Sequence, residues 1–236
     1  MKLYTTQPIE VWNKLQEQKI LIADAMLGEH IDQEYAEKNG FSIEDDSFYA
    51  AYSWMKEQME HRIPGYQGNW PWWAWTHKID IRSERHLYPK GEEFVMIELE
   101  IPDEKVLCSC FQGWHSVLNR RYLAKTMIEE AKADQEWMEI TNMDTDPEKP
   151  KISLYQLRKY AKGEEPWPET IEDSPEKARK KQEYKEKQKR TWENIFDIEW
   201  MKKSQYEGGD QIQACFEELN INQVIKAKMF KGARKS

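Results

Sequence analysis

Cysteine is scarce in this chain, and long hydrophobic runs are lacking. The three cysteines are sparse and odd in number, which excludes a disulfide-stabilised scaffold and favours a reducing compartment. The longest apolar stretch, residues 20–27, is interrupted by Asp24 and is shorter than the roughly 20 residues that a transmembrane helix needs. The first residues become polar too early for a secretory signal. We therefore expect a cytoplasmic protein without a membrane partner.

Glycine-rich phosphate-binding motifs and nucleophile motifs are also lacking. The 10 glycines form neither G-x-G-x-x-G nor a Walker loop, and no G-x-S-x-G is present. A net charge of -8 disfavours a protein that binds nucleic acid over its whole surface. Tryptophan, in contrast, is abundant, with 11 residues among 236. Any bound nucleotide must therefore be held by side chains, and aromatic side chains are available for it.

The hydrophobic periodicity predicts a single α+β domain over residues 1–236. Residues 94–101 alternate between apolar and acidic side chains, as in a half-buried strand. Residues 47–62 and 113–138 show helical spacing instead. We expect a small mixed or antiparallel sheet packed against several helices, with strands at 2–6, 94–101, 105–110 and 211–219. Residues 142–151, rich in Asp, Thr and Pro, predict a surface loop.

A long charged helix is predicted over residues 174–204, protruding from the domain. Residues 175–190 contain eight Lys or Arg against three Glu and almost no apolar side chain. The stretch 177–190 is either a contact for nucleic acid or an acidic protein, or a solvated helix. Its composition favours the solvated helix, with packing resuming at Trp192.

The densest feature of the sequence is an aromatic loop predicted at residues 65–75, which holds four tryptophans within six positions. Trp73 and Trp75 have a parity opposite to Trp70 and Trp72, so the four indoles cannot all pack on one face of a strand. Indoles outside the core line a groove and stack on a base, a nicotinamide or a side chain of a partner. The alternative is that all four only brace the loop over the sheet.

Polar side chains that follow the tryptophans are further candidates for ligand contacts. Arg82 is placed to meet a phosphate. His115 and Asn119 lie four residues apart and project together from a helix, either toward a ligand or as a helix-cap network. Cys108, Cys110, His115 and the distant His77 offer four donors for zinc, and Cys110 with His115 offers a thiol–imidazole pair. The tight C-x-C spacing favours a buried, inert thiol pair, so no metal is expected.

Several segments together resemble a bacterial family described as a domain of unknown function, number 3841. The resemblance covers about the first half of the chain, at ordered spacing. Its members have no established activity, so it implies family membership alone. The residues that carry it are Tyr4-Thr5-Thr6-Gln7-Pro8 with Val11, Trp12 and Leu15; Tyr52-Ser53-Trp54-Met55 with Gln58, Met59 and Arg62; Trp72-Trp73-Ala74-Trp75 with Arg82; and residues 114–119.

The start of the chain, residues 4–7 followed by a helix, also resembles the DNA- and RNA-directed ADP-ribosyltransferases. Those enzymes carry a polar nicotinamide-side residue on the first strand and a catalytic Glu on a late strand. The resemblance implies NAD as cofactor, with Thr5 and Gln7 holding the nicotinamide and Glu217 orienting the ribose. The first strand lacks the His or Arg that is usual there.

These observations lead to two hypotheses for the function. The first is a nucleotide-recognising domain, in its most concrete form an ADP-ribosyltransferase-like enzyme. In that form Trp73 or Trp75 stacks on nicotinamide and Arg82 meets the pyrophosphate, while His115 and Asn119 complete the pocket. The second is a non-catalytic module that uses a Trp-lined groove for a peptide or a single-stranded nucleic acid. The enzyme requires Glu217 near Gln7, whereas the module does not.

Overall fold

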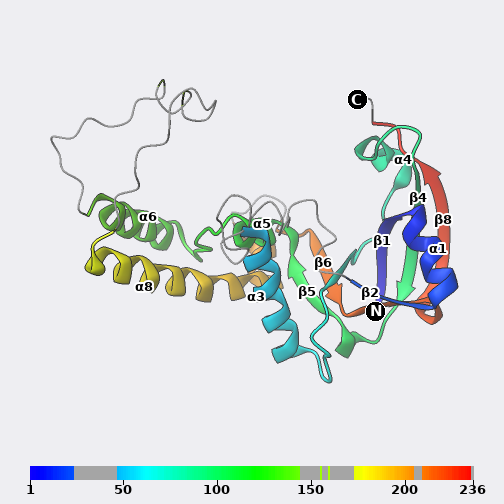
Figure 1. Ribbon diagram of the computed structural model, residues 1–236, viewed down its shortest axis with the longest axis horizontal. Helices are drawn as coiled ribbons and strands as arrows, with labels where there is room; N and C mark the ends of the chain where they lie inside the picture. The colour runs from blue at the N-terminus through cyan, green and yellow to red at the C-terminus, as the bar shows by residue number, and fades with distance from the viewer. Residues whose placement is uncertain (24–46, 144–154, 156–158, 160–172, 205–208, 235–236) are drawn as a thin grey trace. The chain divides into compact units, whose positions relative to one another are not determined.

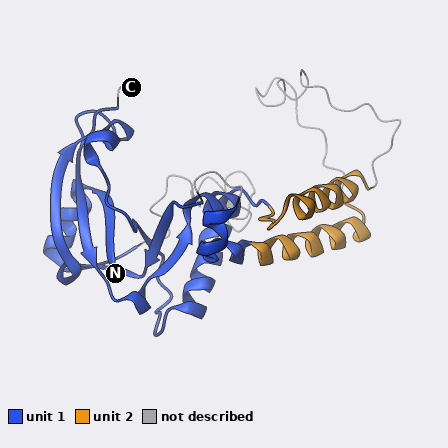
Figure 2. Ribbon diagram, turned by 180° about the vertical axis from the view of Figure 1, so that it is seen from behind, with its two compact units in different colours: residues 1–121, 192–236 blue, residues 122–191 orange. Residues whose placement is uncertain are grey.

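The chain folds into two compact units, coloured separately in Figure 2. The computed structural model describes residues 1–23, 47–143, 155, 159, 173–204 and 209–234. Unit 1 comprises residues 1–121 and 192–236, and unit 2 comprises residues 122–191. The fold is α+β, as the sequence predicts, and the sheet lies entirely in unit 1. Within the described ranges, no helix is both long and apolar enough to cross a membrane.

The core of unit 1 is a six-stranded antiparallel sheet with strand order β5-β6-β3-β1-β4-β8. A separate two-stranded sheet pairs β2 with β7. The strands are β1 (Lys2–Pro8), β2 (Ile20–Ile22), β3 (Trp72–Trp75), β4 (Glu93–Glu100), β5 (Leu107–Cys110), β6 (Ile212–Phe216), β7 (Glu218–Asn220) and β8 (Val224–Lys231).

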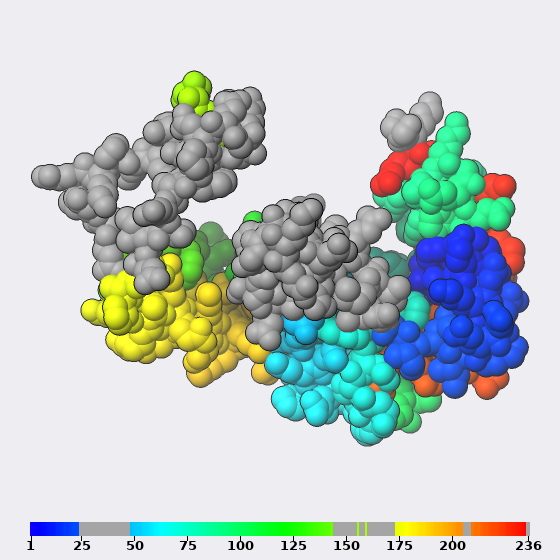
Figure 3. Space-filling model, in the orientation of Figure 1, coloured from blue at the N-terminus to red at the C-terminus, as the bar shows by residue number. Residues whose placement is uncertain are grey.

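Alternation along β4 builds the core on one face of the sheet. Val95, Ile97 and Leu99 are fully buried, and Leu99 lies opposite Leu3 of β1. The amphipathic helix α1 (Ile9–Gln18) covers this face with Trp12 and Leu15. The helix is drawn in blue in Figure 1, and its outward side chains are exposed on the blue surface of Figure 3. Burial of the apolar face is therefore what makes residues 93–100 a strand.

The sheet forks between β1 and β3. β1 pairs with β4 along its whole length, from Lys2 to Pro8, but its only partner pair with β3 is Tyr4 opposite Trp75. Thr5 bridges the opening, since its hydroxyl donates to the carbonyl oxygen of Trp73 at 2.9 Å. In Figure 1, β5 and β6 accordingly stand apart from β1, β4 and β8.

Helices of unit 1 pack around the β5–β6–β3 half of the sheet. They are α3 (Ser47–Arg62), α5 (Phe111–Leu118), the 3-10 turn η5 (Trp192–Phe196) and α9 (Ile198–Lys203). The short α4 (Ile81–Glu84) and the turn η3 (Arg85–Leu87) follow β3. Gly113 of α5 is closely packed, because a Cβ there would lie 2.9 Å from a side-chain methyl of Ile195. α5 therefore approaches η5 closely.

The structure differs from the predicted elements at several points. The aromatic loop expected at 65–75 ends in strand β3, and the helix expected at 113–138 is two helices, α5 and α6 (Met127–Asn142). Arg120 interrupts them with a left-handed φ of 49°. The charged helix expected at 174–204 is α8 (Pro175–Thr191), followed by η5 and α9. Most of the loop expected at 142–151 lies outside the described residues.

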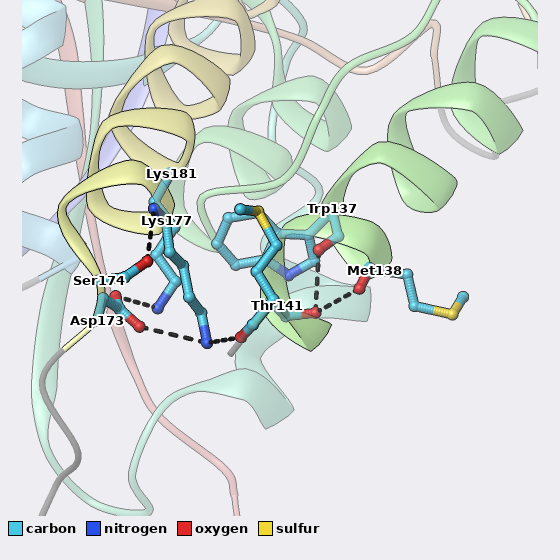
Figure 4. A network of polar contacts seen from close by, with 8 residues as sticks. Trp137, Met138, Thr141, Asp173, Ser174, Lys177 and Lys181 are labelled. Carbon is cyan, nitrogen blue, oxygen red and sulfur yellow. Dashed lines mark hydrogen bonds and ion pairs between the residues drawn. The ribbon is translucent and has the colours of Figure 1, made fainter. Parts of the chain in front are cut away.

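Unit 2 contains the two helices α6 and α8, which pack through Ala133, Ile140 and Tyr184. Figure 4 shows how the start of α8 is held. Asp173 accepts from the Nζ atoms of Lys181 at 2.6 Å and Lys177 at 3.4 Å. These ammonium groups hold the pKa of the Asp173 carboxyl below its ordinary value.

Ion pairs engage much of the basic stretch on α8. Cations along the helix lie within 4 Å of a carboxylate on α8 itself, at Asp173 or on α6; among them are Lys177, Arg179, Lys180, Lys181 and Lys187. Apart from the buried Tyr184, the helix presents mostly exposed side chains. α8 is therefore a solvated helix with internal charge compensation.

Candidate functional site

The fork between β1 and β3 opens into a pocket of about 360 Å³. This volume falls within the range of small-molecule sites, roughly 300–1,000 Å³. Its walls come from β1, β3, β6, α3, α5 and the segment around α4. The lining residues are Thr5, Thr6, Gln7, Tyr52, Trp73, Ala74, Trp75, Ile79, Tyr88, Phe111, Trp114, His115, Leu118 and Gln213.

Two groups of packed rings form the aromatic walls. In the first, Trp73 contacts Trp114 with ring centroids 5.0 Å apart, and Tyr52 packs edge-on against both indoles. In the second, Trp75 contacts Phe111 at 4.8 Å. Such contacts stabilise each pair by about 0.5–1.5 kcal/mol beyond burial of area. The indoles of β3 are therefore held in position before any ligand arrives.

Tyr88 borders the pocket from the other branch of the fork. Its ring packs against Phe94 of β4 at 4.9 Å and Phe230 of β8 at 5.2 Å. The segment after η3, which packs on β4 and β8, thus adds an aromatic side chain to the site.

Thr5 and Gln7 form the polar edge on β1. The Thr5 side chain is buried, and its hydroxyl accepts a hydrogen bond from Gln7 Nε2 at 2.8 Å while donating to Trp73. One oxygen thereby fixes the Gln7 amide and ties β1 to β3. Among the described residues, the second N–H and the carbonyl oxygen of the Gln7 amide have no further partner, so both can bind a ligand.

His115 of α5 is exposed and lies at the rim, with its ring edge-on to Phe111. Its Nδ1 lies 2.9 Å from the Phe111 carbonyl oxygen, which can only accept. The proton of the neutral ring is therefore on Nδ1, which leaves Nε2 as an acceptor. Asn119 caps the same helix by donating to the His115 carbonyl oxygen at 2.7 Å, and it does not line the pocket.

Two polar atoms beside the pocket lack a hydrogen-bond partner among the described residues, the hydroxyl of Thr6 and the indole N–H of Trp73. The Trp73 N–H lies beside the phenol of Tyr52. Burial raises the pKa of Tyr52, and the Trp73 N–H offsets part of that rise. Unpaired buried donors are rare in proteins, so these groups are candidates for ligand contacts.

Glu217 lies outside this pocket and holds a loop. Its Oε1 accepts from the Gln67 backbone N–H at 2.6 Å and from the Asn69 side-chain amide at 3.0 Å. Gly68, between them, has a φ of +83°, which suits glycine. Burial and then the charge of Glu217 raise the pKa of Tyr66 in the same loop. Glu217 and Gln7 therefore do not share the site, although the transferase hypothesis requires it.

Replacing Glu217 by alanine should destabilise unit 1 without changing the pocket. Hydrogen bonds to a charged group contribute about 1.5–3 kcal/mol, so we expect a loss of that size in urea unfolding. Ligand binding at the fork should stay within twofold of wild type. Glu218→Gln, one residue further at a half-buried position, is the control for loss of a negative charge. Loss of binding with unchanged stability would contradict a purely structural role for Glu217.

Arg82 stands on α4 and is exposed. Asp80 caps this helix by accepting from the Arg82 backbone N–H at 3.0 Å. The residue follows Ile79, which does line the pocket, by three positions. The role of Arg82 as a phosphate contact remains a prediction.

The three cysteines are free thiols. Cys110 is packed in a cluster with Met201 and Ile212. Burial raises the pKa of Cys108, Cys110 and Cys215. In the part of the chain that is described, no three His, Cys, Asp or Glu side chains converge as a metal site.

The thiols of the native protein should react slowly with disulfide reagents. Because burial raises the pKa of each thiol, the reactive thiolate is depleted near pH 8. The rate should increase only as the pH passes above the ordinary thiol pKa of 9.0. Unfolding in urea should restore ordinary titration for all three thiols. Fast reaction of the native chain at pH 7 would contradict this.

The structure brings together five of the eight residues that the sequence singled out: Thr5, Gln7, Trp73, Trp75 and His115. Arg82, Asn119 and Glu217 are not among the lining residues. Sequence reasoning missed Tyr52, Tyr88, Trp114 and Gln213. The alternation along residues 211–219 places Gln213 and Cys215 on one face of a strand, which the sequence alone can predict. That Gln213 lies beside Trp75 depends on the pairing of β3 with β6, which the sequence does not show.

Comparison with known proteins yields one family. No curated protein and no solved structure matches the chain. A family model described as Domain of unknown function (DUF3841) matches residues 2–225, which include every residue of the pocket and both compact units almost in full. The chain therefore belongs to the DUF3841 family of domains of unknown function.

Proposed function

We propose that this domain recognises a nucleotide or nucleoside by enclosing its base in the pocket at the fork. The observation that carries the proposal is the combination of two packed ring groups with a neutral polar edge in one pocket. A planar heteroaromatic ring fits such walls because every base has a π face that stacks on indoles. Its ring nitrogens and exocyclic groups then meet amides and hydroxyls.

The proposal covers recognition and not transfer of ADP-ribose. Glu217, the carboxylate that such a transfer would use, is bound to the loop at residues 67–69. Phosphates are expected outside the pocket, near Arg82, because the described lining of the pocket contains no Lys or Arg.

A panel of AMP, GMP, CMP, UMP and NAD tests the proposal. Titration followed by tryptophan fluorescence should show saturable quenching by at least one member. Trp75→Ala should weaken that binding, whereas Trp137→Phe in unit 2 should leave it unchanged. No binding by any member, or equal binding by Trp75→Ala, would overturn the proposal.

An oligonucleotide distinguishes the rival binding module. A groove for single strands needs cations along the backbone, and the described lining of this pocket contains none. A single-stranded oligomer should therefore bind no more tightly than its own mononucleotide. Much tighter binding of the oligomer would favour the module.

A further inference from the structure

The hydrogen-bonding groups left free in the pocket define the chemistry of its ligand. Thr5 is satisfied by Gln7 and Trp73. The remaining donors are the Trp73 N–H and one N–H each of Gln7 and Gln213, and the remaining acceptors include His115 Nε2. The Thr6 hydroxyl can do either. A ligand that satisfies this set must present donors and acceptors together.

Gln213 and Thr5 are the two buried polar residues among the described lining of the site. Gln213 is 5% exposed and lies opposite Trp75 on the neighbouring strand, so its amide shares a face of the sheet with the Trp75 indole. Its Nε2 makes only a long hydrogen bond to Ser109, at 3.4 Å. Its carbonyl oxygen accepts no hydrogen bond from the described residues. A buried amide with free capacity beside stacked rings is suited to bind the edge of a ring.

Charge is missing from the described lining of the pocket. Its side chains are aromatic, aliphatic, hydroxyl or amide, with the exposed imidazole of His115 at the rim. A buried carboxylate without a cationic partner is strongly disfavoured. The pocket therefore discriminates against anionic rings, although such rings have nearly the same shape as neutral ones.

We infer that the site selects a neutral heteroaromatic ring carrying a carboxamide or lactam edge, and that Gln213, with Gln7, is the residue that determines this specificity. A carboxamide or lactam offers an N–H and a C=O side by side, which matches the free N–H and C=O of a glutamine amide. The inference rests on the proposed function, because it assigns the ring class to the same pocket.

Matched small rings test the inference on the unaltered full-length chain. Binding of nicotinamide, nicotinate and pyridine is measured by ligand-observed NMR, with uracil and orotate as a second neutral and anionic pair. We expect each neutral amide or lactam to bind at least about tenfold more tightly than its carboxylate counterpart. Nicotinamide should also bind about tenfold more tightly than pyridine, because one or two hydrogen bonds are lost.

A glutamine variant then assigns the preference to a residue. Gln213→Met should reduce the nicotinamide-to-pyridine ratio toward one while leaving pyridine binding unchanged, an outcome that a general loss of folding would not produce. Gln7→Met, on the less buried edge, gives the same test if Gln213→Met does not fold.

The outcomes separate this inference from the proposed function. Equal binding of all rings, or an unchanged ratio in both variants, overturns the specificity inference and leaves ring recognition in place. Binding of no ring overturns both. A nicotinamide-to-pyridine affinity ratio near one, with pyridine binding retained, supports the assignment of the specificity to Gln213 or Gln7, whichever was replaced.

Discussion

Replacing Trp73 by alanine is expected to weaken ring binding more than any other single change in the pocket. Stacking of a base on an aromatic side chain contributes about 1–3 kcal/mol, which corresponds to a roughly 5- to 150-fold change in Kd. Trp73 also packs against Trp114 and Tyr52. Its truncation therefore removes the ring on which the base stacks and also the support of these two neighbouring side chains. Calorimetric titration with the tightest nucleotide of the panel measures the effect.

Two control variants separate the loss of stacking in Trp73→Ala from a general effect of removing a tryptophan. Trp73→Phe keeps a stacking ring and should retain most of the affinity. Trp137→Phe, in unit 2, should bind as wild type does. Near-ultraviolet circular dichroism checks that Trp73→Ala keeps its aromatic packing elsewhere. Unchanged affinity in a folded Trp73→Ala variant would contradict the placement of the ring at the fork.

Replacing Phe216 by alanine should produce the largest loss of stability. Phe216 is 1% exposed in the main core cluster and lies opposite Trp72 across β3 and β6. Truncating a buried phenylalanine costs about 3–5 kcal/mol, from lost burial and the cavity that remains. Urea unfolding followed by near-ultraviolet circular dichroism measures the change.

Met229→Ala is the control for that experiment. Met229 lies on the edge strand β8 and is 62% exposed, so its truncation should change the free energy of unfolding by less than about 0.5 kcal/mol. A comparable loss in both variants would show that the core does not lie where the structure places it.

The elements with one buried face could be predicted from the sequence, and those without one could not. β4 was predicted because Val95, Ile97 and Leu99 alternate with outward side chains and pack in the core. β8 was missed because it is an edge strand with mostly exposed side chains, so burial imposes little pattern on it. In β3, the consecutive tryptophans mask the alternation, because an indole is apolar on either face.

For the site too, residues with a local sequence pattern could be singled out, and those placed by contacts between distant segments could not. Trp73 and Trp75 were singled out because four clustered tryptophans of mixed parity cannot all pack on one strand face. Gln7 was singled out because the first strand resembles that of ADP-ribosyltransferases. Gln213 and Trp114 were missed because their place in the pocket depends on strand pairing and helix packing between distant segments. Arg82 was a candidate because it follows the tryptophans, and Asn119 because it lies four residues after His115. Glu217 was a candidate because the resemblance to ADP-ribosyltransferases implies a late-strand glutamate. Local capping or loop hydrogen bonds engage parts of all three.

The proposed base-binding pocket lies at the fork of the sheet, where β5 and β6 stand apart from β1, β4 and β8 (Figure 1). The indole N–H of Trp73 is a direct probe of binding in this pocket. Each of the 11 tryptophans contributes one indole N–H signal to a ¹H–¹⁵N spectrum of the full chain. The Trp73 signal is assigned by its loss in Trp73→Phe. On titration with uridine and adenosine, the signals of Trp73 and Trp75 should shift saturably while that of Trp137 stays fixed. Shifts confined to tryptophans outside the pocket, or none with either nucleoside, would contradict base recognition at the fork.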